Sequence, residues 1–304
     1  MLKSEIRKDY LLDKYVIITP GRLLRPRDVE EQTIISRVAD CPFCPEKIDR
    51  KNIVDQIEAP EGKILSVNNV FPAVTLDNKK AYGAQEVIVE TTSHKKELHD
   101  LSEKQIELLL RMYAKRTAAL SKIKGIEYIL CFKNQGSKAG ASIVHAHSQI
   151  FATDLLPPDI KEELKISYNY QLAKKTCAYC DIIEKEMKSP RAIYEDKSIA
   201  CFAPYASQYH YEAWIFTKRH LDNITKFNHE EFASCAKILK KILLKLNRLN
   251  LSFNYFLHQV ISDSNQHFYI KIQPRDSVWA GVELGSGLVI NSVPPEEAAK
   301  FLKK

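Results

Sequence analysis

Two CxxC pairs constrain the fold of this chain more than any other feature of its sequence. Reading onward from each pair gives the same order: an apolar segment, a strand-like run, a histidine, an amphipathic segment and two more strand-like runs. Such self-similarity indicates an internal duplication. Thiolates and imidazoles are good zinc ligands, and four of them close a tetrahedral site. The sequence therefore predicts two ligand sets for Zn2+: Cys41, Cys44, His94 and His145, then Cys177, Cys180, His220 and His267.

The cysteines also have interpretations other than zinc binding. Seven cysteines, an odd number in a chain that shows no secretory signal, argue against a disulfide framework. A CxxC pair is also compatible with redox chemistry, or with small buried hydrophobic residues while His94 and His220 lie at the surface. The charged N-terminus lacks a signal-peptide core, which predicts a cytoplasmic location. No apolar run approaches the length of a membrane helix, so no membrane association is expected.

The segments between the predicted ligands have helix and strand periodicity. Ser102 with Gln105, and Asn228 with Glu231, stand in capping-box positions. Each pair opens an apolar stripe at helical spacing, formed by Ile106, Leu109, Leu110, Tyr113 and Leu120 in the first and by Phe232, Ala236, Leu239, Ile242, Leu243 and Leu246 in the second.

Helices that alternate with pairs of short strands favour the α+β class. We expect two tandem halves, each an antiparallel sheet with a packed helix. The run DLLPPDIKEELKISYNYQLAKK, residues 154–175, has a proline pair followed by a charged segment that is predicted to be a helical linker. The halves are accordingly residues 1–160 and residues 161–304.

The run IVHAHSQIF, residues 143–151, places three polar residues in an apolar strand. In an extended strand His145, His147 and Gln149 share one face. If His145 binds a metal, His147 stays free beside a rigid centre, and its near-neutral pKa suits a nucleophile. Gln149 is placed to donate an amide hydrogen bond to a phosphoryl oxygen. The alternative is a pair of packed or surface histidines.

The corresponding strand of the second copy reads HFYIKIQP and lacks the second histidine. It keeps His267 but has Tyr269 where the first copy has His147. We therefore expect one reactive histidine per chain, in a catalytic half formed by residues 1–160. The net charge of +7 comes from scattered lysines and arginines, which favours phosphorylated small molecules over nucleic acid.

HAHSQ resembles the HxHxQ signature of the galactose-1-phosphate uridylyltransferase branch of the histidine-triad superfamily, which includes plant-type ADP-glucose phosphorylase. Several segments are similar to family motifs in the same order: DYLLDKYVIITPGRLLRPRD, CPFC, VNNVFPAV, EVIVETTSH, FKNQGSKAGASIVHAHSQI and AGVELGSGLVINSVPPEEAAKFL. The resemblance covers nearly the whole chain. It implies histidine-triad-like halves, with catalytic His147 and Gln149 beside the substrate-binding residues Arg22, Arg25, Asn69, Asn134, Gly140, Ser142 and Glu283.

The resemblance also implies a ping-pong reaction. His147 attacks the α-phosphorus of a nucleotide sugar, sugar 1-phosphate leaves, and a second phosphorylated acceptor takes the nucleotidyl group. The expected activity is that of a nucleotidyltransferase of galactose metabolism, which moves UMP between UDP-hexose and hexose 1-phosphate. The expected assembly is a homodimer that completes the active site. One departure is Val282, which stands where the best-known uridylyltransferases have an aromatic residue before the sugar-binding glutamate.

Two other functions remain open on sequence grounds. The first is adenylyl transfer to phosphate of the ADP-glucose phosphorylase type, or nucleotide-sugar hydrolysis. Histidine-triad hydrolases usually have a third histidine where Gln149 stands, which favours transfer to phosphate-bearing acceptors. The second is a non-catalytic, zinc-stapled nucleic-acid binder, but the aromatic residues show no RNA-binding signature.

Overall fold

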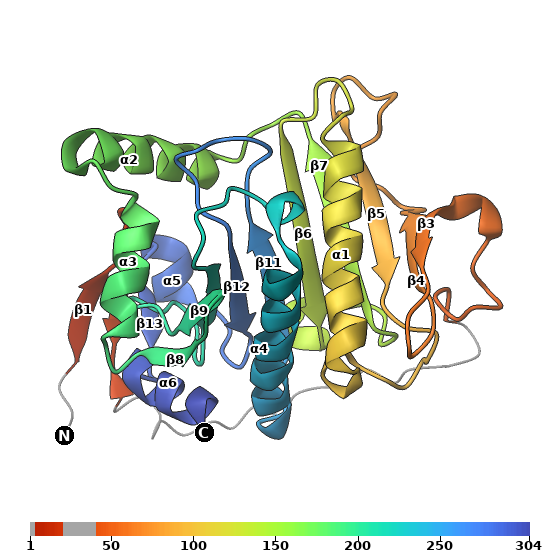
Figure 1. Ribbon diagram of the computed structural model, residues 1–304. Helices are drawn as coiled ribbons and strands as arrows, with labels where there is room; N and C mark the ends of the chain where they lie inside the picture. Colours follow the sequence, from red (N-terminus) through yellow and green to blue (C-terminus); the bar gives the residue numbers. More distant parts are fainter. Residues whose placement is uncertain (1–3, 21–40) are drawn as a thin grey trace.

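One ten-stranded antiparallel sheet runs through the protein (Figure 1). The computed structural model describes residues 4–20 and 41–304. From one edge to the middle, the strands are β3 (Ile53–Ile57), β4 (Ile64–Asn68), β5 (Gly83–Val89), β7 (His147–Thr153) and β6 (Tyr128–Gln135). From the middle to the other edge they are β11 (Phe253–His258), β12 (Tyr269–Pro274), β10 (Ala213–Thr217), β9 (Ile199–Phe202) and β8 (Ala192–Glu195).

The strand order repeats on the two sides of the middle of the sheet. From the middle outward, the order on one side is β6, β7, β5, β4 and β3. The order on the other side is β11, β12, β10, β9 and β8, so each strand of the first half has a counterpart in the second. The two sets meet where β6 pairs with β11, with Asn134 opposite Asn254. The predicted mixed fold with antiparallel sheets is confirmed, and the duplicated sequence order corresponds to a duplicated strand order within one shared sheet.

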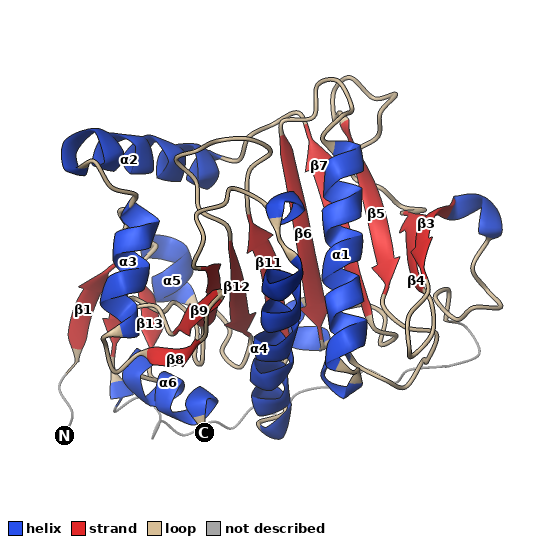
Figure 2. Cartoon of the chain, viewed as in Figure 1, coloured by secondary structure: helices blue, strands red, loops and turns tan. Residues whose placement is uncertain are grey.

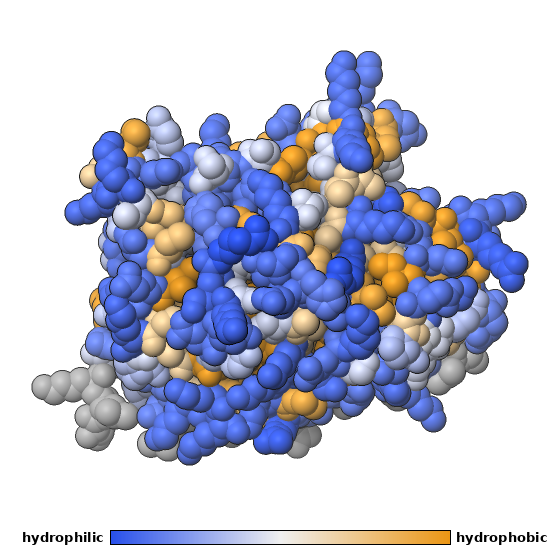
Figure 3. Space-filling model, viewed as in Figure 1, coloured by the Kyte–Doolittle hydropathy of each residue, from blue (hydrophilic) through white to orange (hydrophobic). Residues whose placement is uncertain are grey.

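Two long helices lie side by side on one face of the sheet (Figures 1 and 2). They are α1 (Glu103–Leu120) and α4 (His229–Arg248), and both predicted stripes are buried in the core between helices and sheet. The side of the molecule that carries them is covered mainly by hydrophilic residues (Figure 3). Within the described residues, no helix has the length and apolar character needed to cross a membrane.

The predicted helix starts agree with the structure in position, with one difference in chemistry. Asn228 and Glu231 form a reciprocal capping box at α4. The hydroxyl of Ser102 caps α1 by accepting a hydrogen bond from the backbone N–H of Gln105. The side chain of Gln105, however, does not bond back to the backbone of Ser102. The side-chain amide of Gln105 donates instead to the backbone carbonyls of Gly62 and Glu90. This amide is fully buried, and a buried amide needs hydrogen-bond partners within the protein.

The remaining elements surround the second half of the sheet. The predicted helical linker is α2 (Pro158–Lys174), so the expected boundary between residues 160 and 161 falls inside a helix. It is followed by α3 (Ala178–Met187), and the chain ends with α5 (Gly281–Ser286) and α6 (Pro295–Lys303). A separate three-stranded sheet joins the chain ends through β1 (Glu5–Lys8), β2 (Tyr15–Ile18) and β13 (Val289–Asn291).

Short 3-10 turns complete the described chain. They are η3 (Arg50–Asn52), η4 (Leu98–Asp100), η5 (Ser137–Ala139) and η6 (Ile224–Lys226). Two of them position the candidate site, because η4 follows β5 and η5 follows β6.

Candidate active site

The first predicted ligand set comes together at the end of β7. Cys41 and Cys44 lie in a turn, and the Sγ of Cys41 is 3.6 Å from Nδ1 of His145. The Sγ of Cys44 is 3.5 Å from Nδ1 of His94. All four ligand atoms lie within 4.8 Å of one another. The residues expected from spacing alone, up to 104 positions apart, therefore form one cluster.

The second predicted set also comes together, at the equivalent place in the second half of the sheet. The Sγ of Cys180 is 3.6 Å from Nδ1 of both His220 and His267, and Cys177 completes a cluster with ligand atoms within 4.8 Å. The two clusters differ in burial. Cys41, Cys44 and His145 are buried, whereas Cys177 and Cys180 are half-buried and His220 is exposed.

Both clusters have the dimensions of a tetrahedral site. Metal bonds of about 2.3 Å to sulfur and about 2.0 Å to nitrogen place these two ligand atoms about 3.5 Å apart. In both sets Nδ1 faces the thiols, while the other ring nitrogen donates to a backbone carbonyl: His145 Nε2 to Thr91 at 2.8 Å and His267 Nε2 to Thr217 at 2.7 Å. Such bonds fix the tautomer that a metal requires. Each set is able to hold a metal ion.

His147 is the first residue of β7, and its ring is held in one tautomer. Its Nδ1 lies 2.8 Å from the carbonyl oxygen of His145, so Nδ1 carries the hydrogen and Nε2 carries the lone pair. Burial, together with the positive charge of Lys133, lowers the pKa of His147 to about 4. The ring is therefore neutral near pH 7.

The rings of His145 and His147 lie on the same side of the structure. Both contact the ring of Phe43, with centroids 6.4 Å and 4.9 Å away respectively. Both also line a cavity of about 620 Å³. Strand alternation alone does not explain this arrangement, because β7 begins at His147 and His145 precedes the strand.

Gln149 extends from β7 two positions further along. Its side-chain oxygen accepts a hydrogen bond of 3.0 Å from the amide of Gln85 on the neighbouring β5. The amide nitrogen of Gln149 is thereby turned away from Gln85, and it has no acceptor among the described residues. An amide held in this way is able to donate to a ligand oxygen.

The loop between β6 and β7 forms a wall of the same cavity. Asn134 and Ser142 line it, and the Asn134 side chain is fixed by a bond of 2.8 Å from Asn254. Gly136 and Gly140 bracket η5 with φ angles of 82° and 83°. A Cβ at Gly136 would stand 2.2 Å from Oγ of Ser252, so only glycine fits there.

Three of the predicted substrate-binding residues do not line this cavity, and two predicted arginines lie outside the described residues. Asn69 lines a different cavity of about 320 Å³, together with Gln85. Glu283 is in α5, where its carboxylate accepts from the backbone nitrogen of Ala280 at 2.9 Å, and it does not line the His147 cavity. Gly140 borders η5 without lining that cavity. Arg22 and Arg25 fall outside the described residues.

A buried ion pair below His147 was not predicted from the sequence. Lys133 is 1% exposed, and its Nζ lies 2.9 Å from Oε2 of Glu90, which is fully buried. The same Nζ donates to the carbonyl of His147 at 3.0 Å and so fixes the backbone of the candidate nucleophile. A lysine inside an apolar strand-like run was the available signal, since a buried lysine requires a partner.

Comparisons with known proteins identify the family. Residues 1–157 match the family model of the galactose-1-phosphate uridyl transferase N-terminal domain. A galactose-1-phosphate uridylyltransferase from Thermotoga maritima is 30% identical over 328 residues, covering 99% of this chain and 98% of that protein.

Solved structures show the same relationship. An ADP-glucose phosphorylase from Arabidopsis thaliana with bound ADP-glucose superposes with a TM-score of 0.86 at 27% identity, covering 99% of both chains. A uridylyltransferase structure gives a TM-score of 0.77 at 29% identity, covering 99% of this chain and 98% of that chain. The protein is thus a transferase, and it belongs to the galactose-1-phosphate uridylyltransferase family.

Proposed function

We propose that the protein moves a UMP group between UDP-hexose and hexose 1-phosphate by a ping-pong mechanism through His147. The observation that carries this proposal is the state of the His147 ring. Its Nδ1 is committed to the His145 carbonyl, its Nε2 carries the lone pair, and the ring lines a cavity of about 620 Å³. A buried, neutral imidazole of fixed orientation has the properties of a nucleophile.

In the proposed first step, Nε2 of His147 attacks the α-phosphorus of the nucleotide sugar. A nitrogen–phosphorus bond forms, the bond between the α-phosphorus and its bridging oxygen breaks, and sugar 1-phosphate leaves with that electron pair. In the second step an oxygen of the acceptor phosphate attacks the same phosphorus and His147 leaves. Phosphoryl transfer depends mainly on positioning and charge stabilisation, which the amide of Gln149 and the hydroxyl of Ser142 would supply.

The two Cys2His2 sets are proposed to hold Zn2+. Four protein ligands of sulfur and nitrogen close the coordination sphere, which is the arrangement of a structural zinc site. The ion would supply rigidity only. Within the chain, the carbonyl of His145 orients the ring of His147.

The position of Glu283 supports a homodimer. Its carboxylate does not line the His147 cavity of its own chain, although the family resemblance implies contact with sugar hydroxyls. The same segment exposes Val278 and Leu284, which are 83% and 74% exposed. We infer that a second copy covers this segment and brings Glu283 to the neighbouring site. Light scattering would show a monomer mass if the inference is wrong.

Adenylyl transfer from ADP-glucose to phosphate is the second candidate. The TM-score of 0.86 with the Arabidopsis ADP-glucose phosphorylase, against 0.77 with the uridylyltransferase, favours it. Val282 beside Glu283 points the same way, because the best-known uridylyltransferases have an aromatic residue there.

Intact-protein mass spectrometry separates these candidates. The protein is incubated separately with UDP-glucose, UDP-galactose and ADP-glucose, and the adduct mass identifies the nucleotidyl group retained. Peptide mapping should place the adduct on His147, and the His147→Ala variant should remain unmodified. A UMP adduct supports the first candidate and an AMP adduct the second. Turnover without any adduct, or an adduct on another residue, would contradict the mechanism.

A further inference from the structure

The two Cys2His2 sets have the same ligand types but different surroundings. In the first set Cys41 and Cys44 are each 4% exposed, and His145 is fully buried. In the second set both cysteines are half-buried and His220 is exposed. The chain therefore holds one buried and one accessible pair of thiols, and each pair is an internal control for the other.

The two CxxC pairs also differ in their local backbone. Cys177 is the N-cap of α3 and has an extended backbone, and Cys180 lies in the first turn of that helix. Cys41 and Cys44 lie in a turn that is not part of a helix. A CxxC pair at a helix N-terminus is an arrangement in which thiols undergo reversible oxidation. The second pair has this arrangement and the first pair lacks it.

A cavity of about 320 Å³ borders Cys180. Part of its wall is apolar and comes from Ile183 and Met187, which follow Cys180 along the same helix. Its rim carries two ion pairs: Lys188 with Glu184, and Lys218 with Glu195. Because these charges are paired, the rim does not select an ionic molecule. A small neutral molecule is therefore able to reach Cys180 through this cavity.

The two sulfur atoms of the second pair are close enough to become bonded. They lie within 4.8 Å of each other, in residues three positions apart. A disulfide bond measures about 2 Å, so rotation of the two side chains and a small backbone adjustment are sufficient. Bonding would leave the set with only His220 and His267, and two ligands do not hold a tetrahedral ion.

We propose that Cys177 and Cys180 are an oxidation site, at which hydrogen peroxide converts the two thiolates into a disulfide. The set then keeps two of its four ligands and releases its metal ion. This inference assigns thiol chemistry to the half of the chain that lacks the candidate nucleophile. It uses the proposed zinc binding and is independent of the proposed nucleotidyl transfer.

The reaction has two steps. The sulfur of Cys180 attacks one oxygen of hydrogen peroxide, the oxygen–oxygen bond breaks, and hydroxide leaves, which gives a sulfenic acid. The sulfur of Cys177 then attacks the sulfur of Cys180, the sulfur–oxygen bond breaks, and a second hydroxide leaves. Each hydroxide takes a proton from solvent to form water. Two electrons pass from the pair of thiolates to the peroxide.

Oxidation should affect stability in one half of the molecule. The second set joins the start of α3 to His220, which follows β10, and to His267, which precedes β12. Releasing the ion separates these segments, and metal binding is coupled to folding. The first set keeps all four ligands, so His145 stays in place beside His147.

Limiting hydrogen peroxide, added to the zinc-loaded full chain, tests the site. Thiols that remain are alkylated, and mass spectrometry of tryptic peptides follows each pair separately. Residues 176–185 (TCAYCDIIEK) contain only the second pair, and residues 38–47 (VADCPFCPEK) contain only the first. A disulfide lowers the peptide mass by two hydrogens and blocks alkylation. A zinc indicator records the ions released, and elemental analysis before oxidation tests the zinc proposal separately.

We expect the second pair to be oxidised at least about tenfold faster than the first, because its thiols are accessible. One zinc ion should leave for each disulfide formed, and the unfolding temperature should fall. Reductant together with zinc should restore both. Cys177→Ser should stop at the sulfenic acid and take dimedone on Cys180. Cys235→Ala is the matched control, since Cys235 is fully buried and outside both sets, and it should behave as the wild type.

Four outcomes would overturn the oxidation site. They are equal rates for the two peptides, faster oxidation of the first pair, a disulfide in residues 176–185 with both ions still bound, and oxygen added only to methionine. Failure of Cys180 to take dimedone in a folded Cys177→Ser variant would do the same. The wild-type measurements remain decisive if that variant does not fold. None of these results depends on whether a nucleotidyl-histidine forms.

Discussion

The reactivity expected of His147 depends on bonds made by its neighbours. The carbonyl of His145 accepts from Nδ1, and Lys133 donates to the carbonyl of His147 itself. Ring and backbone are therefore fixed from two directions. Positioning of this kind is worth more in phosphoryl transfer than the intrinsic strength of the nucleophile.

Replacing His147 with alanine should reduce nucleotidyl transfer by roughly a thousandfold or more, because the covalent route is lost. Metal content should not change, since all eight predicted ligands remain. Enzyme assay and elemental analysis of the same preparation provide the measurement. His229→Ala, at the exposed start of α4, is the matched histidine control. Transfer at the wild-type rate in the His147 variant would refute the assignment.

Glu97 should make stability depend on pH in a predictable direction. Burial raises its pKa from 4.5 to about 7, so the folded state binds a proton that the unfolded state has lost between those pH values. Stability should therefore fall as pH rises through this window. Relative to Glu97→Gln, the wild-type unfolding free energy should drop by roughly 2–3 kcal/mol between pH 4.5 and pH 8. Urea unfolding at several pH values measures this, and parallel profiles would contradict it.

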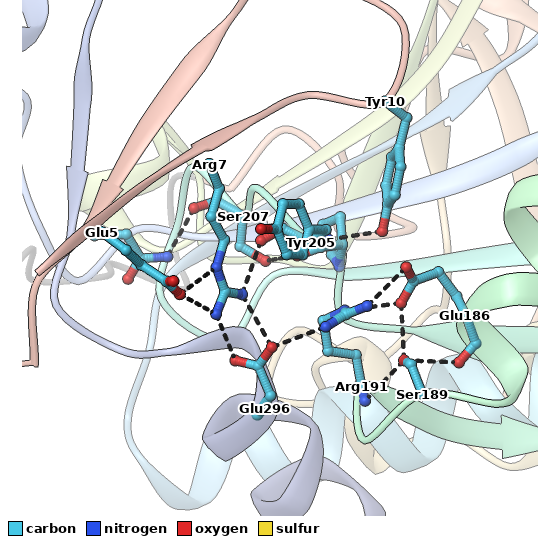
Figure 4. A network of polar contacts seen from close by, with 11 residues as sticks. Glu5, Arg7, Tyr10, Glu186, Ser189, Arg191, Tyr205, Ser207 and Glu296 are labelled. Carbon is cyan, nitrogen blue, oxygen red and sulfur yellow. Dashed lines mark hydrogen bonds and ion pairs between the residues drawn. The ribbon is translucent and has the colours of Figure 1, made fainter. Parts of the chain in front are cut away.

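At the scale of elements, a polar network ties the chain ends to the second half of the sheet (Figure 4). Arg191 donates twice to Glu186 at the end of α3, at 2.8 Å and 2.9 Å, and once to Glu296 in α6 at 2.9 Å. Arg7 of β1 also donates to Glu296, at 3.0 Å. The ring of Tyr205 packs against both guanidinium groups, 4.6 Å from Arg7 and 5.1 Å from Arg191.

Replacing Arg191 with methionine should destabilise the protein by about 3–5 kcal/mol, because the fully buried carboxyl group of Glu186 would lose its ionic partner. Chemical unfolding gives the free energy. Lys188→Met is the matched control, since Lys188 and Glu184 form an exposed pair that should contribute about 0–1 kcal/mol. Equal losses in the two variants would show that burial does not determine the strength of this network.

At the scale of the whole molecule, the duplication has kept two ligand sets but only one candidate nucleophile. His145 and His267 lie two positions before the starts of β7 and β12, and Tyr269 begins β12 as His147 begins β7. Tyr269 is 1% exposed and packs in an aromatic cluster with Phe216 and Tyr179. We propose that residues 1–160 are the catalytic half and residues 161–304 a related half without a nucleophile.

The two proposed zinc ions should leave at different rates. A chelator should remove the ion at Cys180 first, because His220 is exposed and the first set is mostly buried. A colorimetric zinc indicator should record two phases, and Cys180→Ser should lack the fast one. Cys44→Ser should lack the slow phase and unfold at a lower temperature, since metal binding is coupled to folding. A fast phase that persists in Cys180→Ser would reverse the assignment.

The sequence by itself determined the features that depend on local spacing. CxxC pairs, capping residues such as Asn228, and apolar stripes at helical period are set by neighbours within a few positions, and all appear where they were expected. The order of motifs identified the ligand sets and the strand of His147, because each half repeats one plan.

Only the tertiary structure decided how the halves join and what surrounds the nucleophile. β6 and β11 pair through backbone hydrogen bonds. Every residue type except proline can make these bonds, so the amino-acid sequence does not specify which two strands pair. The ion pair of Lys133 with Glu90 spans 43 positions, and Glu97, Gln135 and Asp276 line one cavity from three separate segments. Such contacts form because folding buries polar groups that must then find partners, and distance along the chain does not specify which partner is near.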